Sequence, residues 1–292
     1  MASDNYKPPL IVVKLAHEDS MTEVARQVFY LNKPSILSDR KLLNNTCSDR
    51  ERHSKETSLL GCYLSVDRGI FIYNIVEKRL EGTMETTAAH EMLHAFYVRL
   101  SETEKNHIDA VIEQAYKDLT DHDIRFRVEL YPKEQRDAEL HSILGTEVAR
   151  LPVELETYYS RYFLERSRVV AFAKRSKAEI ERQTSLVHNY DQQLGQLKKN
   201  IDQQTNQIIR ESNQVSQLRK RLQSIPAGER TKEYNEVTEV INLHIHEYNR
   251  LVMAYDRDAN QYNEVAAKRN SLASDTQELI KTLDTRETPT QL

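Results

Sequence analysis

Two histidines and a glutamate stand close together in the segment 86–100, which otherwise resembles an ordinary helix. His90 and His94 are four positions apart, so on a helix their imidazoles project from one face and can bind the same Zn²⁺ ion. Glu91 lies beside that face and is placed to reach a water on the metal. Zinc lowers the pKa of such a water towards 7, and a carboxylate can take its proton and pass it to a leaving amine. The spacing therefore predicts peptide-bond hydrolysis with Glu91 as general base.

The run HEMLH at residues 90–94 resembles the signature of the zincin metallopeptidases. The metzincin branch of that group expects a glycine and a third histidine soon afterwards, but Tyr97 and Leu100 stand there. The resemblance therefore implies a gluzincin-like enzyme or one that uses a distant third histidine. It covers about residues 60–150.

In gluzincins the third ligand is a glutamate on a later helix, followed by a small residue three positions on and an aspartate four on. Glu139 and Ser142 match that pattern, whereas Ile143 replaces the aspartate. The resemblance thus implies His90, His94 and Glu139 as zinc ligands.

Three other residues compete with Glu139 for the third position. Glu147 lies near the centre of an apolar helix face, where an unpaired carboxylate would be costly. It is expected to bind the zinc, or to accept a hydrogen bond from a metal-bound histidine in place of the missing aspartate. His107 and His141 are also available. The sequence leaves this choice open.

The segments before the two histidines predict a small sheet. Residues 10–15 (LIVVKL) read as a buried strand, and a helix capped by Ser20 follows. Residues 62–75 read as a hairpin that turns at 67–69. We expect that hairpin to offer an edge strand to an extended peptide.

Helical spacing dominates after residue 86. Ser101 and Glu104 form a predicted capping box that starts a new helix, and further helices are expected from about Arg136 and from Pro152. Between them, residues 120–135 look less regular. Four aromatic residues follow at helical spacing and are interpreted as core: Tyr158, Tyr159, Tyr162 and Phe163.

The last part of the chain carries heptad repeats. One row runs from Val187 to Leu222, Gln204 and Glu211 interrupt its companion row, and a second series runs from Tyr234 to Tyr262. Pro226 and Gly228 separate the two series. The pattern predicts an antiparallel helical hairpin over residues 166–292, after a domain at 1–165.

Composition limits the partners. A net charge of -4 with mixed signs offers no broad cationic face, so nucleic acid is not expected. No window has the length and apolar character of a signal peptide or a membrane span, which favours a cytoplasmic protein. Cys47 and Cys62 are therefore expected to be free thiols.

These observations together predict an α+β protein, with a small zincin-like domain followed by the long antiparallel hairpin. The expected function is that of a zinc metallopeptidase acting on a peptide or protein, with the hairpin binding a protein partner or a second copy. The alternative is a coiled-coil interaction or scaffold protein whose zincin-like domain binds without catalysis. A toxin-like protease with a single target protein would use the same site.

Overall fold

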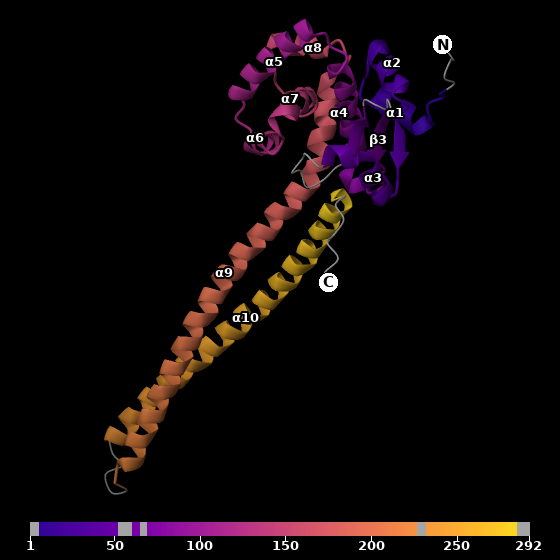
Figure 1. Cartoon of the computed structure of the whole chain (residues 1–292). Coiled ribbons are helices and arrows are strands. Elements are labelled where there is room, and N and C mark those ends of the chain that lie inside the picture. Colours follow the sequence, from indigo (N-terminus) through magenta and orange to yellow (C-terminus); the bar gives the residue numbers. More distant parts are fainter. Residues whose placement is uncertain (1–5, 52–59, 65–68, 227–231, 285–292) are drawn as a thin grey trace. The chain divides into compact units, whose positions relative to one another are not determined.

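A computed structural model describes residues 6–51, 60–64, 69–226 and 232–284 (Figure 1). The chain divides into two compact units. The first comprises Met1–Glu181 with Glu278–Leu292, and the second comprises Arg182–Gln277. The boundary expected at residues 165/166 thus falls inside the first unit, which includes the start of one long helix and the end of the other.

The N-terminal segment is helical where a strand was expected. Residues 10–15 belong to α1 (Leu10–Glu18), in which Val12, Leu15 and Ala16 are buried and Leu10 is exposed. The strand prediction is wrong because the buried members of this apolar run recur at a spacing of three to four residues, which is that of a helix. Helix α2 (Glu23–Leu31) is capped by Thr22, whose hydroxyl accepts from the Ala25 amide, and not by Ser20.

Three short strands form a mixed sheet in the order β1-β3-β2. β1 (Ser35–Leu37) runs parallel to β3 (Gly69–Tyr73), and β2 (Gly61–Leu64) pairs antiparallel with β3. The β2–β3 hairpin confirms the prediction for this segment, although the turn residues 67–68 lie outside the described residues. β3 is central, so β2 is the hairpin strand at the sheet edge.

Helices build the rest of the first unit. The helix α3 (Arg40–Glu51) precedes the hairpin, and a 3-10 turn (Lys78–Leu80) precedes α4 (Thr83–Tyr97). The predicted capping box of Ser101 and Glu104 is confirmed at the start of α5 (Glu102–Lys117). Next come α6 (His122–Glu129), α7 (Lys133–Glu147) and α8 (Val153–Tyr159).

Two helical expectations need correction. Helix α6 lies in the segment that looked irregular, where Asp121 caps it by accepting from the Ile124 amide and Val128 is buried. The single helix expected from Pro152 is two helices, α8 and α9 (Arg166–Ser224). A β-bridge between Met21 and Phe163 occupies the break.

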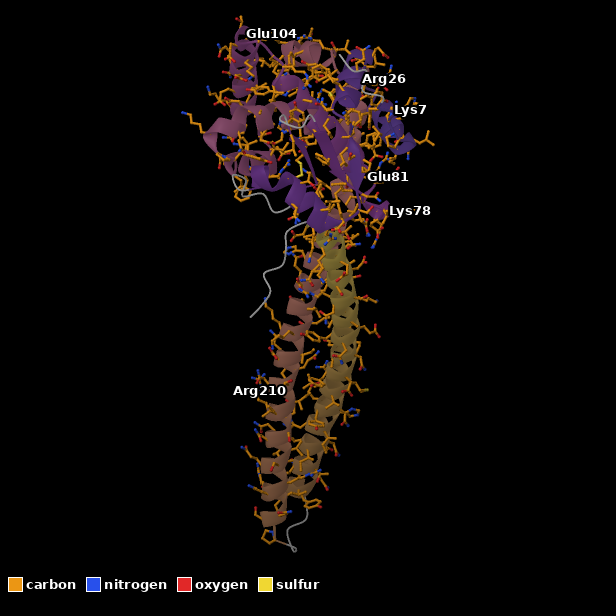
Figure 2. The ribbon with its side chains drawn as sticks, turned by 45° about the vertical axis from the view of Figure 1, so that its right-hand side comes forward. Lys7, Arg26, Lys78, Glu81, Glu104 and Arg210 are labelled. Carbon is orange, nitrogen blue, oxygen red and sulfur yellow. A yellow bond between two sulfur atoms is a disulfide. The ribbon has the colours of Figure 1, made fainter. Side chains whose placement is uncertain are left out.

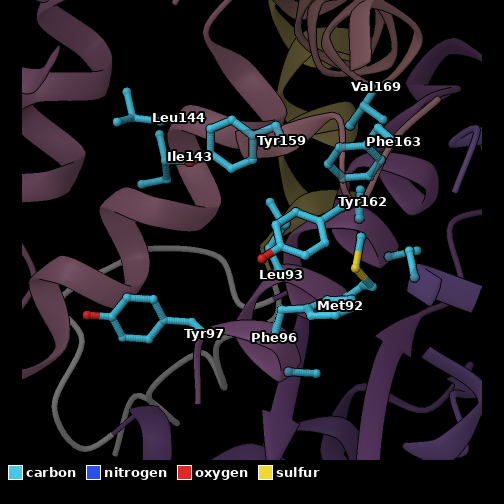
Figure 3. Packing of buried hydrophobic residues seen from close by; sticks show 14 of the residues in the cluster. Met92, Leu93, Phe96, Tyr97, Ile143, Leu144, Tyr159, Tyr162, Phe163 and Val169 are labelled. Atoms are coloured by element: carbon cyan, nitrogen blue, oxygen red, sulfur yellow. The ribbon is translucent and has the colours of Figure 1, made fainter. Parts of the chain in front are cut away.

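The core of the first unit surrounds α4. Phe96 packs on Tyr162 with ring centroids 4.4 Å apart, and Tyr159 and Phe163 are also buried (Figure 3). The interpretation of these aromatic residues as core is confirmed: three are buried, and Tyr158 is partly buried and packs against the same cluster. α4 is therefore held on several sides, which fixes the direction of the side chains it carries.

Cys47 of α3 and Cys62 of β2 form a disulfide (Figure 2). The expectation of two free thiols is wrong, because the fold brings their Cα atoms to 5.9 Å, within the range that a disulfide spans. The bond is fully buried and fastens the edge strand to α3.

The second unit is an antiparallel pair of helical segments, from α9 and from α10 (Lys232–Leu283). Members of the predicted heptad rows are buried or half-buried in it. The two interruptions make polar pairs across the seam: Gln204 donates to Asp258 at 2.8 Å, and Glu211 lies 2.6 Å from His244 Nδ1. Such pairs disfavour other registers, because slippage would leave them without partners.

No helix among the described residues has both the length and the apolar character needed to cross a bilayer.

Candidate metal centre

His90 and His94 lie one turn apart on α4, as their spacing predicts. Their Nε2 atoms are 3.1 Å apart, and their rings meet edge to face with centroids 4.8 Å apart. His94 is buried, whereas His90 is partly accessible. The two nitrogens thus converge on one point at the border between the core and solvent.

Glu139 of α7 completes this cluster. Its Oε2 atom lies 3.3 Å from the Nε2 atoms of both His90 and His94. Gly145, six residues further along α7, allows the close packing that this requires. A Cβ atom at that position would come within 2.5 Å of Leu93 Cδ1 and 2.7 Å of the Tyr159 ring.

The spacing of the three atoms suits a tetrahedral zinc ion. Ligand atoms about 2.0–2.1 Å from zinc at tetrahedral angles are separated by about 3.3–3.4 Å. The observed separations are 3.1 to 3.3 Å. Within the described part of the chain, this is the one group of three or more His, Cys, Asp or Glu side chains with such a geometry.

The electrostatics of the cluster favour a cation. Burial alone would raise the pKa of Glu139, but the facing His94 and His90 imidazoles hold it well below its ordinary value. Burial disfavours a charged His90, yet Glu139 and the nearby Glu91 outweigh burial and raise the pKa of His90. An ionised carboxylate is therefore held against two imidazoles in a site of low dielectric.

Glu91 is buried on α4 next to the cluster. Strand β2 passes close to it, because a Cβ atom on Gly61 would lie 3.3 Å from Glu91 Cγ and only 2.5 Å from the Thr87 methyl group. Any larger residue at position 61 would push the strand away from α4. The glycine therefore lets the edge strand lie directly against the helix face that carries Glu91.

The structure places the competing residues elsewhere. Glu147 accepts from Arg127 at 3.0 and 2.6 Å and from Lys177 at 2.8 Å. Burial would raise its pKa, but these two cations lower the pKa of Glu147 to about 2. Arg127 and Lys177 are therefore the partners that compensate for the burial of the Glu147 carboxylate.

The other two histidines also lie outside the cluster. His107 is exposed and pairs with Glu154 at 3.2 Å. His141 is fully buried with Nε2 at 2.9 Å from the Tyr158 hydroxyl. Burial, reinforced by His94 and His90, lowers the pKa of His141 to about 3, so this histidine is neutral.

A pocket of about 530 Å³ opens beside Glu91, His90 and Glu139. The edge strand supplies Leu60 and Gly61, and Ile143 lies one turn beyond Glu139. The remaining lining comes from α4, α6, α7, the segment between α6 and α7, and the two long helices. Sequence reasoning missed most of it: Thr83, Thr86, Thr87, Asp123, Phe126, Arg127, Leu130, Tyr131, Gln135, Glu147, Ala173, Ser176, Lys177, Ile180, Glu181 and Leu283. Their residue types carry no catalytic pattern, and only the packing of the helices brings them together.

No family model, curated protein or solved structure matches this chain. The functional argument therefore rests on the site itself.

Proposed function

We propose that this protein is a zinc-dependent metallopeptidase that hydrolyses peptide bonds, with His90, His94 and Glu139 as its zinc ligands. The observation that carries the proposal is the convergence of three ligand atoms to mutual distances of 3.1 to 3.3 Å. Three protein ligands are the usual number in a catalytic zinc site, where a fourth position stays open. An adjoining pocket fits that arrangement.

Each residue has a separate task. When bound, zinc would lower the pKa of a coordinated water towards 7 and polarise the scissile carbonyl. Glu91 is the general base that takes a proton from the attacking water and later gives it to the leaving amine. Its place on α4, one residue after His90, keeps its carboxylate out of the ligand set while holding it beside the pocket.

The edge strand is suited to binding an extended peptide. Leu60 and Gly61 line the pocket, and among the described strands β2 pairs only with β3, so its other edge is the one to which a substrate strand could add. A substrate backbone that adds to this edge would run past Glu91, because Gly61 lies against that residue. This orientation brings a scissile carbonyl to the metal centre.

The order of the ligands along the chain supports a gluzincin-like enzyme, with two histidines on one helix and a glutamate on a later one. The helical hairpin would then recruit a protein substrate, a partner or a second copy of the chain. A buried disulfide is more common in proteins of oxidising compartments, so it weighs against the cytoplasmic location expected from the sequence.

One observation favours the competing function of a non-catalytic binding domain with a coiled coil. Ile143 stands where the resemblance expects an aspartate, and it is buried in the core. Such a carboxylate would orient a metal-bound histidine, and losing this kind of support typically costs 10- to 100-fold in metal affinity or activity.

Elemental analysis joined to a peptidase assay tests the proposal. We expect one zinc per chain in the parent, loss of zinc in His94→Ala, and retention of zinc in the matched control His107→Ala. Hydrolysis of an unstructured protein should stop with a chelator and return with added zinc. Stoichiometric zinc without hydrolysis of any peptide would favour the binding domain, and a chain that holds no zinc would refute the metallopeptidase.

A further inference from the structure

The two long helices contribute to the wall of the candidate active-site pocket. Ala173, Ser176, Lys177 and Ile180 of α9 recur at the spacing of one helix face, and all four line the pocket. Leu283, the last residue of α10, lines it too. All of these residues belong to the first compact unit, so the wall is part of that unit.

The ends of both helices are fastened to the rest of the first unit. Lys177 of α9 donates to Glu147 of α7 at 2.8 Å. Arg40 of α3 donates to the backbone carbonyl of Thr282, the neighbour of Leu283, at 3.4 Å. The pocket wall is therefore held in place by contacts on both sides.

The chemistry of this wall selects an apolar group. Its two cations, Arg127 and Lys177, are both committed to Glu147. Much of the remaining lining is apolar and comes from α6 with the residue that follows it, from α7, from α9 and from the end of α10: Phe126, Leu130, Ile143, Ile180 and Leu283. A charged side chain placed there would lose water, and an acidic one would find both cations of the wall already paired with Glu147.

We infer that Ile180 of α9 and Leu283 of α10 are specificity-determining residues that bind a large apolar side chain of the substrate next to the scissile bond. This inference rests on the proposed function, because it takes the metal centre as the position of that bond. The start of α9 and the end of α10 therefore belong to the catalytic domain, and their side chains contact the substrate.

Two hydroxamates that differ in one side chain test the inference by binding, without turnover. Both chelate zinc, but acetohydroxamate carries a methyl group whereas 4-methylpentanohydroxamate carries a branched alkyl chain. We expect the zinc-loaded full-length protein to bind the larger compound about 10- to 100-fold more tightly by calorimetry. Ile180→Asp and, independently, Leu283→Asp should each weaken binding of the larger compound much more than binding of acetohydroxamate, and so remove most of that preference.

Ala178→Asp is the matched control. It adds the same charge to the same helix, but residue 178 is exposed, does not line the pocket and faces away from residue 180. The Ala178→Asp variant should prefer the larger hydroxamate as strongly as the parent does. An undiminished preference in both pocket variants, or no preference in the parent, would overturn the inference while leaving the proposed function standing. Failure of the parent to hold zinc or to bind either compound would refute the proposed function itself.

Discussion

Glu139 Oε2 lies 3.3 Å from His94 Nε2, although the two residues belong to different helices and neither is close to the other in sequence. This contact turns a pair of histidines into a cluster of three potential metal ligands. It depends on the close packing of α4 and α7, in which Gly145 leaves room for Leu93 and Tyr159. The local motif supplies only two of the three residues of this cluster.

Glu139→Gln should weaken zinc binding, whereas Glu147→Gln should not. An amide at 139 is a much poorer zinc ligand, so we expect the affinity for zinc to fall by at least about 100-fold. Glu147→Gln should hold zinc like the parent, because Glu147 pairs with Arg127 and Lys177. The amount of zinc retained after dialysis against a mild chelator measures the effect of each substitution. Equal losses would place Glu147 in the metal centre.

Stability should depend on pH through Glu147. Its pKa is lowered to about 2 in the folded protein from an ordinary 4.5, so its stabilising contribution is complete above about pH 4.5 and is lost as the pH falls towards 2. At pH 7, Glu147→Gln should reduce the free energy of unfolding by about 2–3 kcal/mol, allowing for the partly exposed Lys177. The difference in the free energy of unfolding between variant and parent should decrease as the pH falls from about 4.5 towards 2, as measured by urea titrations. A difference that does not change with pH would contradict the stabilising role of the ionised Glu147.

Glu91→Gln should separate chemistry from metal binding. The amide has nearly the size of the carboxylate and keeps the packing against Gly61, but it cannot accept the proton. We therefore expect normal zinc content and a loss of at least 10²- to 10⁴-fold in kcat. A variant that cleaves as fast as the parent would sink the metallopeptidase proposal, even with zinc bound.

Asp19→Asn should stabilise the protein at neutral pH. Asp19 is fully buried, and neither of its carboxylate oxygens has a hydrogen-bond partner among the described residues. Burial and the neighbouring Glu85 and Glu18 raise its pKa well above the ordinary 3.8. The folded state therefore loses stability as the pH rises above about 4, and the amide removes that loss.

The expected gain for Asp19→Asn is on the order of 1–3 kcal/mol at pH 7, vanishing near pH 4. Thermal unfolding at several pH values measures it. Asp202→Asn, at an exposed site on α9, is the control and should change stability by less than about 0.5 kcal/mol. A destabilised Asp19→Asn variant would mean that the carboxylate has a stabilising role.

The hairpin should be removable without loss of the metal centre, provided that its base is kept. Replacing residues 184–274 with a short Gly/Ser linker retains the pocket wall and the hydrogen bond from Gln183 to Asp275. We expect this variant to fold and to bind one zinc. A chain cut after Lys177 also lacks Ile180 and Leu283, and it should lose the preference for the larger hydroxamate. Circular dichroism and zinc content, measured side by side, decide whether the unit boundary is correct.

The sequence alone determined the features that depend on local spacing. Four-residue spacing set His90 and His94 on one helix face, the Ser101–Glu104 pair set a helix start, and seven-residue spacing set the hairpin seam. In each case the physical cause lies within a few residues of backbone. The wrong strand at 10–15 shows the limit, since a short apolar run suits a strand and a buried helix equally well.

Only the tertiary structure decided which distant residues meet. Glu139 and Glu147 both lie on α7, two turns apart, and both needed a partner. The packing of α4 brought two imidazoles to Glu139, while α6 and α9 brought Arg127 and Lys177 to Glu147. The Cys47–Cys62 disulfide and the contribution of Leu283 to the pocket arose in the same way. Contacts of this kind depend on how whole elements bury their apolar faces, and no short stretch of sequence contains that information.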